Sequence, residues 1–290
     1  QFPPGVNVTV TAKSATKKAS TVDIGWIDGT GVNLGTVIVA GDLGRVTAGS
    51  GNSKINGLGT LDVKSLGVQG LATQGGTGDL VSAINGGIGA VKIAGDLHGA
   101  KVTATKIGTV SIIGALRGLG DNTGRIETTG DIGAITIGKV EGGGINSASV
   151  ISGGNLGAIT IKGSVTGGAG GGSAVFAAKH GNIGAVRVMG DLKGVGAGSA
   201  SFTATGEVQM IIPPDPNPYD YSYPAEIYKW VGGRIASVTI DGSLIGGGAD
   251  SANIVAEIAG AVGPVIVRGD LTGRTGAGSA AIRADVAVYD

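Results

Sequence analysis

The sequence predicts an all-β fold, a right-handed single-stranded parallel β-helix, or solenoid, of about nine to eleven coils of roughly 25 residues each. Three observations predict it. A short apolar phrase recurs along the chain, each copy alternates apolar and variable residues, and the segments between copies are rich in glycine. Because the repeat is too short for a β-α-β unit and shows no helical period, successive strands must stack in parallel.

The repeated phrase is an apolar residue, Gly, any residue, and then three residues that alternate apolar, variable and apolar. A corner rich in Gly, Asp and Ser follows and ends on another apolar residue. Successive copies start roughly 25 residues apart, with one doubled gap between Ile183 and Ile235. The copies begin at Leu34, Leu58, Ile88, Ile107, Ile132, Leu156, Ile183, Ile235 and Val262.

Each phrase is expected to form a strand with one buried face, because its apolar residues recur with period two. In one copy, Val91 and Ile93 should point into the core and Lys92 to solvent. A second, weaker strand follows most phrases, and a short third side is expected around the Asp-Leu or Ser-Leu corner. Glycine should supply the positive φ angles of the corners. The second strands are predicted at 101–104, 147–151, 173–177, 199–204, 251–256 and 279–284.

Composition supports a folded protein and argues against several functions. The chain has 60 Gly among 290 residues, yet it is 41% hydrophobic, which is enough to build a core of Val, Ile, Leu and Ala. Its 21 basic and 21 acidic residues leave no net charge, which argues against nucleic-acid binding. No apolar run reaches the ~18 residues of a membrane-spanning helix. The absence of cysteine excludes disulfides and thiolate metal sites.

The repeat divides the chain into four regions. Residues 1–30 are interpreted as an N-terminal capping-strand region, in which 6–10 alternates well and Trp26 is expected to act as a lid over the first coil. Residues 31–206 are coils, and 207–232 are a Pro- and Tyr-rich insertion loop. Residues 233–290 are further coils, which are expected to continue to an uncapped end where strand edges invite pairing.

The insertion loop is the main candidate for a contact site. It holds most of the prolines and half of the aromatic residues of the chain. Long loops are usually functional or disordered, and exposed Tyr and Trp are frequent binding anchors. The alternative is that the loop folds onto the rod and buries its rings. The candidate contacts with a ligand or partner are Tyr219, Tyr221, Tyr223, Tyr228 and Trp230.

No catalytic carboxylate pair stands out, because the acidic residues are scattered singly. The best local group is Asp215, Asp220 and Glu226 beside Lys229 and Arg234. We interpret it as solvated loop charges, and a glycosidase pair is the alternative.

Aspartates recur at the Gly-Asp corners that follow the phrase. The favoured role is a turn role, because Asp side chains commonly bond the local backbone. Stacked carboxylates bridged by Ca²⁺ are the alternative, and no other cofactor is expected. The corner residues are Asp42, Asp96, Asp191 and Asp270.

The phrase with its Gly-Asp corner, as at 34–43, 88–97 and 183–192, resembles the Gly-rich β-helical repeats of large bacterial surface and secreted proteins. These include adhesins and autotransporter-type passenger domains. The resemblance covers about residues 31–290 and implies an extracellular or cell-surface location in a bacterium. It informs the fold more than the function, because stacked solenoids carry many roles.

The sequence therefore predicts a non-enzymatic extracellular structural protein, a rod segment or self-assembling subunit of a bacterial surface layer, fibre or adhesin. The expected partners are another copy bound end to end, or neighbouring domains of a longer chain, with glycans as a further class. The alternative is a carbohydrate-binding or polysaccharide-degrading β-helix that uses the aromatic residues of 207–232.

Overall fold

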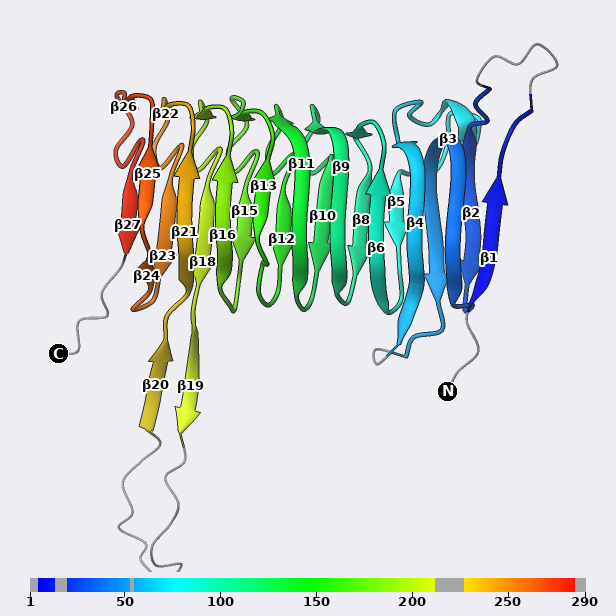
Figure 1. The fold of residues 1–290 in the computed structure, drawn as a ribbon, viewed down its shortest axis with the longest axis horizontal. Coiled ribbons are helices and arrows are strands. Elements are labelled where there is room, and N and C mark those ends of the chain that lie inside the picture. Colours follow the sequence, from blue (N-terminus) through cyan, green and yellow to red (C-terminus); the bar gives the residue numbers. More distant parts are fainter. Residues whose placement is uncertain (1–4, 14–19, 53–54, 212–226, 285–290) are drawn as a thin grey trace, which may run out of the picture.

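The fold is an elongated stack of short strands wound into coils (Figure 1). It is known from a computed structural model that describes residues 5–13, 20–52, 55–211 and 227–284, and the side chains of 208–230 lie outside that description. The described residues contain no α-helix and one short 3-10 helix, η1 (Ala72–Gln74). The prediction of a parallel β-solenoid is confirmed.

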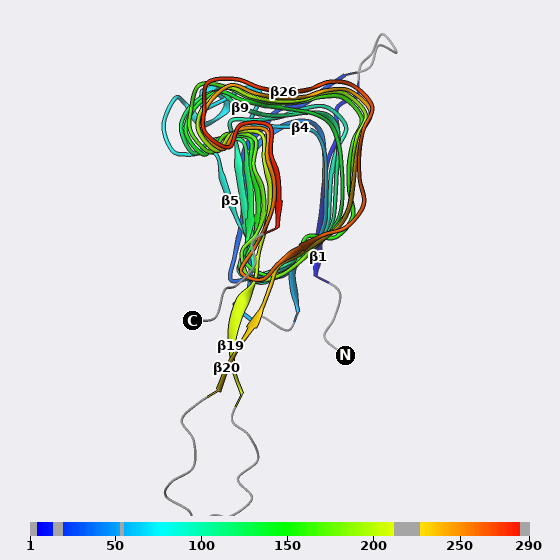
Figure 2. The same cartoon turned by 90° about the vertical axis from the view of Figure 1, so that its left-hand side faces the viewer.

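The larger sheet has 17 strands in the described part of the chain. It covers two adjacent sides of the rod, because strands such as β3, β9 and β11 run through the corner between them (Figure 2). Its strands are β1 (Val6–Val10), β2 (Ile24–Thr30), β3 (Leu34–Gly49), β4 (Asn56–Leu66), β6 (Gly87–Ile93), β7 (Leu97–His98), β9 (Ile107–Gly118), β11 (Ile132–Gly142), β13 (Ile159–Ile161), β14 (Val165–Gly167), β16 (Ile183–Val188), β17 (Leu192–Gly194), β21 (Arg234–Ile240), β22 (Leu244–Gly246), β24 (Ala261–Val262), β25 (Val265–Val267) and β26 (Leu271–Gly273).

A second sheet of eight strands forms the third side of the rod, again counted over the described residues (Figure 2). Its neighbouring strands all pair in parallel. They are β5 (Val81–Ala83), β8 (Lys101–Ala104), β10 (Arg125–Thr128), β12 (Val150–Ser152), β15 (Phe176–Ala178), β18 (Phe202–Thr205), β23 (Ile254–Glu257) and β27 (Ile282–Ala284).

The register places equivalent residues of successive coils directly above one another. Along the first side, Val110 pairs with Ile135, and Ile135 pairs with Ile159. The same column continues through Val186, which pairs directly with Val238. The coils on either side of the insertion are therefore neighbours, as the doubled gap in the repeat predicts.

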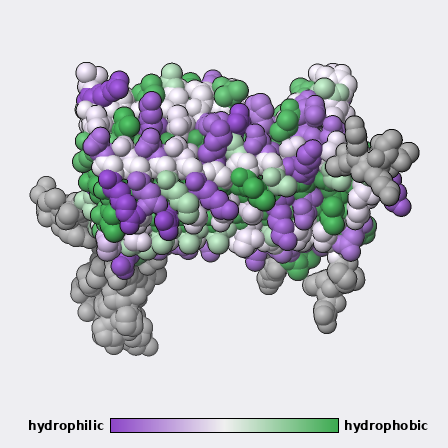
Figure 3. Space-filling model, turned by 45° about the horizontal axis from the view of Figure 1, so that its top comes forward, coloured by the Kyte–Doolittle hydropathy of each residue, from purple (hydrophilic) through white to green (hydrophobic). Residues whose placement is uncertain are grey.

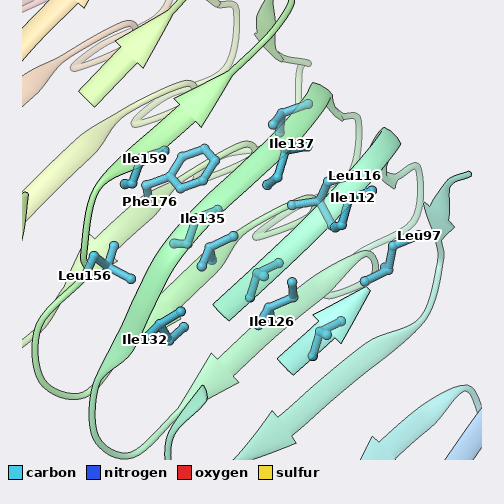
Figure 4. Packing of buried hydrophobic residues seen from close by; sticks show 14 of the residues in the cluster. Leu97, Ile112, Leu116, Ile126, Ile132, Ile135, Ile137, Leu156, Ile159 and Phe176 are labelled. Carbon is cyan, nitrogen blue, oxygen red and sulfur yellow. The ribbon is translucent and has the colours of Figure 1, made fainter. Parts of the chain in front are cut away.

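The core is a continuous column of Val, Ile, Leu and Phe that fills the inside of the coils (Figure 4). The alternation predicted from the phrase is observed: Val91 and Ile93 are buried and Lys92 between them is exposed. On the outer surface, hydrophilic and hydrophobic side chains are interspersed along the rod (Figure 3).

Five of the second strands begin three residues later than the alternation predicts, because a corner precedes them. The predicted segment 173–177 begins with Ser173-Ala174, whereas β15 starts at Phe176. Ala174 has a φ of 57°, in the left-handed region that alanine seldom adopts. The equivalent alanines of the other coils share this conformation, so the Ser-Ala pair is a repeated corner. They are Ala148, Ala200, Ala252 and Ala280.

Glycine is needed where this corner packs against the neighbouring coil. A Cβ added at Gly167 would lie 2.6 Å from the Cβ of Ser199 and 2.8 Å from the backbone nitrogen of Ala200. Real Cβ atoms do not approach that closely, so any larger residue would force the two coils apart.

The insertion forms an antiparallel hairpin where its backbone is described. Strand β19 (Glu207–Ile211) pairs with β20 (Ile227–Val231), and the hairpin projects away from the stacked coils (Figures 1 and 2). At the other end of the rod, β1 and β2 both pair in parallel with β3. The N-terminal region therefore adds two sides of a further coil.

Candidate functional site

The aromatic residues predicted to make contacts all fall outside the described side chains. Tyr219, Tyr221 and Tyr223 lie within 212–226, outside the described residues. Tyr228 and Trp230 lie on β20, of which the backbone alone is described. Their role in binding remains a prediction.

The charged group predicted in the same region is described only at its end. Asp215, Asp220 and Glu226 lie outside the described residues, and Lys229 has a described backbone only. Arg234 is exposed at the start of β21. The glycosidase interpretation of this group also remains a prediction.

The first of the corner aspartates, Asp42, is buried and bonded on both carboxylate oxygens. Its Oδ1 accepts hydrogen bonds from the Ser65 hydroxyl at 2.7 Å and the Val68 N–H at 3.0 Å. Its Oδ2 accepts one from the Gln69 N–H at 2.9 Å. The carboxylate therefore holds the corner of the next coil.

Two of the later corner aspartates make the same kind of bond through their carboxylates, whereas Asp270 takes part through its backbone N–H. Asp96 accepts the Ala115 N–H at 2.8 Å, and Asp191 accepts the Ser243 N–H at 2.8 Å. The Ser243 hydroxyl in turn accepts the N–H of Asp270 at 3.0 Å.

The register shows why these carboxylates do not form a stacked ladder of charge. Neutral or cationic residues separate them within one column, so no two of the predicted aspartates are neighbours. The order along the column is Asp42, Ser65, Asp96, Ala115, Lys139, Ser164, Asp191, Ser243 and Asp270.

Sequence reasoning missed a second side-chain ladder at the corner where each coil re-enters the first side. The Asp131 carboxylate accepts the Asn155 N–H at 2.7 Å, and the Asn155 side chain accepts the Asn182 N–H at 2.9 Å. The Asn182 side-chain oxygen in turn accepts the Arg234 N–H at 2.9 Å. The signal was in the sequence, because an Asn or Asp stands directly before the apolar residue of several phrases.

The Trp26 side chain lines a hollow on the described surface. The predicted lid is wrong: Trp26 lies on the outer side of β2, 45% exposed, because its neighbour Ile27 takes the inward position. The Arg45 guanidinium lies 4.2 Å from the ring centroid. The indole N–H donates to the Thr47 hydroxyl at 3.2 Å, which fixes the orientation of the ring.

The segment that carries η1 closes over this side of the rod and forms a cleft, which we call the Trp26 cleft. Its volume is about 480 Å³. Glycine allows the close approach, because a Cβ at Gly25 would lie 2.3 Å from the Thr73 carbonyl oxygen. The lining side chains are those of Trp26, Arg45, Thr73, Gln74 and Thr77.

Two carboxylates flank the cleft, and both have lowered pKa values. Hydrogen bonds from the Thr30 hydroxyl and N–H lower the pKa of Asp28, assisted by the Thr47 hydroxyl. The Val81 N–H lowers the pKa of Asp79, and Arg45 adds to this through an ion pair of 2.8 Å. Both groups are therefore carboxylates at neutral pH.

A second hollow adjoins the Trp26 cleft along the same surface. It has a volume of about 440 Å³, and its polar lining includes Thr30, Thr47 and Asn85. Thr47 joins the two hollows, since its hydroxyl accepts from Trp26 and lies 3.2 Å from that of Thr30.

Another groove, of about 510 Å³, lies at the corner between the first two sides of the rod. Glu141 and Asp96 both pair with Arg117, at 3.1 Å and 3.3 Å. Ile113 beside it is 66% exposed. The charges of this groove are largely satisfied by one another.

Comparison with known proteins leaves the interpretation to the structure. No family model, curated protein or solved structure matches the chain. Over the described residues, no three His, Cys, Asp or Glu side chains are grouped so that they could hold a metal ion. The same residues include no helix with the length and hydrophobicity needed to cross a bilayer.

Proposed function

We propose that the chain is a structural rod of a bacterial surface layer, fibre or adhesin, exported from the cell and built as a right-handed solenoid with coils of roughly 25 residues. The observation that carries the proposal is the continuous register from β3 to β26, in which each coil bonds to the next through backbone ladders. A rod of this kind spans distance with little dependence on its outer side chains.

The side-chain ladders at two corners support a load-resisting role. The column that starts at Asp42 and the column from Asp131 to Asn182 both connect neighbouring coils through charged or amide oxygens that accept backbone N–H groups. Such bonds link consecutive coils at the corners, in addition to the backbone ladders of the sheets.

The last described coil offers a surface for end-to-end association. Leu271 and Ile282 are 60% and 42% exposed, whereas their partners Leu244 and Ile254 in the preceding coil are 0% exposed. Further β-structure stacked on this coil would bury both side chains. We propose that another copy or a neighbouring domain supplies it.

Electron microscopy and small-angle scattering over a concentration series test this proposal. We expect the purified chain to lengthen along the rod axis as the concentration rises. The double substitution Leu271→Lys and Ile282→Lys should leave single short rods, whereas Thr272→Lys, at the residue beside Leu271, should not. Single rods at every concentration, or equal lengthening of both variants, would refute end-to-end assembly.

A second candidate function is carbohydrate binding or polysaccharide degradation by the insertion. The hairpin of β19 and β20 favours it, because its described backbone projects away from the stacked coils (Figure 1). Substitution of Tyr221, Tyr223 and Trp230 by Ala should abolish glycan binding by this arm. Unchanged binding would refute the role of these three residues.

A further inference from the structure

The Trp26 ring is a platform held in place from one side. Its contact with the Arg45 guanidinium covers one face, while 45% of the residue remains exposed. Arg45 is itself held by Asp79, so the support beneath the ring is fixed before any ligand arrives. A flat apolar surface of this kind suits the C–H face of a sugar ring, and its prior ordering lowers the cost of binding.

Hydrogen-bonding groups surround the platform. Asp28 and Thr30 follow Trp26 on the outer side of β2 and are exposed. Gln74 and Thr77 line the cleft from the η1 segment. The Thr73 hydroxyl is buried and has no hydrogen-bond partner. Sugar hydroxyls both donate and accept, so a mixed set of carboxylate, hydroxyl and amide groups matches them.

The negative charge beside Trp26 favours neutral sugars over acidic ones. Two carboxylates, Asp28 and Asp79, stand beside a single guanidinium, that of Arg45, and both carboxylates keep their charge to low pH. Asp79 is paired with Arg45, which leaves the charge of Asp28 on the open surface. An acidic sugar would meet a like charge there, whereas a neutral one would gain a charge-assisted hydrogen bond.

The arrangement of the two hollows favours a chain of sugars over a single unit. The Trp26–Thr47 hydrogen bond connects the two hollows, since Trp26 lines the Trp26 cleft and Thr47 lines the second hollow; their volumes are about 480 and 440 Å³. We propose that this surface binds a neutral oligosaccharide, with one pyranose ring stacked on Trp26 and its hydroxyls bonded to Asp28 and the Thr side chains. The proposal does not depend on the assembly of the rod, nor on the 207–232 insertion.

The test uses the full chain and a panel of probes: maltohexaose, cellohexaose, xylohexaose and chitohexaose as neutral oligosaccharides, and hexagalacturonate as the acidic one. Trp230→Phe leaves Trp26 as the only tryptophan, so its fluorescence reports directly on the cleft. We expect saturable binding of at least one neutral probe in this background. Hexagalacturonate should bind about tenfold more weakly or not at all.

Variants then assign the site, with isothermal titration calorimetry as the readout. Trp26→Ala should weaken binding by about tenfold or more, as expected for loss of an anchoring ring. Trp26→Phe should retain part of it, and Asp28→Asn should weaken it while keeping the acceptor oxygen that holds Thr30. Lys193→Ala, on an outer position of β17, is the matched control and should bind as the unaltered chain does.

Three results would overturn the proposal. One is the absence of saturable binding by every neutral probe. Another is binding that survives Trp26→Ala, and the third is tighter binding of hexagalacturonate than of any neutral probe. Loss of binding in Trp230→Phe with Trp26→Ala unaffected would place glycan recognition on the hairpin instead.

Discussion

The stacked pair of Phe176 and Phe202 gives the sharpest test of the core. The two rings lie on neighbouring strands β15 and β18, with centroids 5.0 Å apart and planes inclined by 17°. Both side chains are 0% exposed. In a column otherwise built from aliphatic residues, these rings fill the interior of two consecutive coils.

Truncation of one ring should be costly. Phe202→Ala removes a fully buried ring and leaves a cavity that the regular backbone ladders prevent from collapsing, so we expect a loss of about 3–5 kcal/mol in the free energy of unfolding. Phe202→Leu keeps most of the volume and loses the ring contact, so its cost should be nearer about 1 kcal/mol.

Urea unfolding followed by circular dichroism gives the stability, and hydrogen exchange with mass spectrometry locates the loss. Because each coil contacts only its neighbours, exchange should rise first in the coils around β15, β18 and β23. Thr203→Ala, at the adjacent outward position of β18, should change stability by less than about 0.5 kcal/mol. A loss below about 1 kcal/mol for Phe202→Ala, or uniform exchange along the rod, would refute this account of the core.

Three further predictions test the corners and the surface. Gly167→Ala should destabilise the rod by about 1–3 kcal/mol, because the added Cβ would meet the next coil; thermal unfolding measures this. Asn155→Ala should cost about 1–2 kcal/mol in urea unfolding, because it removes the side-chain hydrogen bonds to Asp131 in one neighbouring coil and to the Asn182 N–H in the other. Asp241→Asn should lower the melting temperature slightly at neutral pH, because Arg187 and Arg268 stabilise the carboxylate and lower its pKa. This stabilisation is fully present above pH 3.8, the ordinary pKa of the carboxyl group. It should vanish as the pH falls through the lower pKa that Asp241 has in the folded state.

Each of these predictions has a matched control. Gly171→Ala should be nearly neutral, since its nearest neighbour would lie 3.4 Å away; equal losses at both glycines would contradict the steric argument. Thr160→Ala, on an outer position without a corner bond, should leave stability intact where Asn155→Ala does not. If the difference between Asp241→Asn and the unaltered chain persists at acid pH or in high salt, the ion pairs are not its cause.

The sequence predicted the strands of the first side well because their pattern is set by burial alone. An apolar residue at every second position specifies which way Val91, Lys92 and Ile93 point, and no distant contact is needed to decide it. The conformation of the corners was harder to predict from the sequence. Ala174 and its equivalents adopt a left-handed conformation that alanine disfavours, and they do so because a buried methyl group fits where the coils turn.

The candidate site could not be predicted because it depends on which segments meet. Trp26 and Arg45 are far apart in the chain and meet because β2 pairs with β3, while Asp79 reaches Arg45 from the segment that follows η1. Nothing in the local pattern around Trp26 indicates an arginine beneath its ring. The ladder from Asp131 to Asn182 differs, because its residues recur at one position of the repeat and were available to sequence reasoning.

The hairpin of β19 and β20 shows how the rod can vary without being redesigned. Val186 pairs with Val238 in the same register that joins uninterrupted coils, so the core is unaffected by the detour of the chain between them. The entropy of closing such a detour rises slowly with its length, by about 0.6 kcal/mol for each doubling. This corner is therefore a natural grafting point. Evolution could exchange the arm, or an engineer could attach an enzyme or an epitope there, while the coils keep their stability.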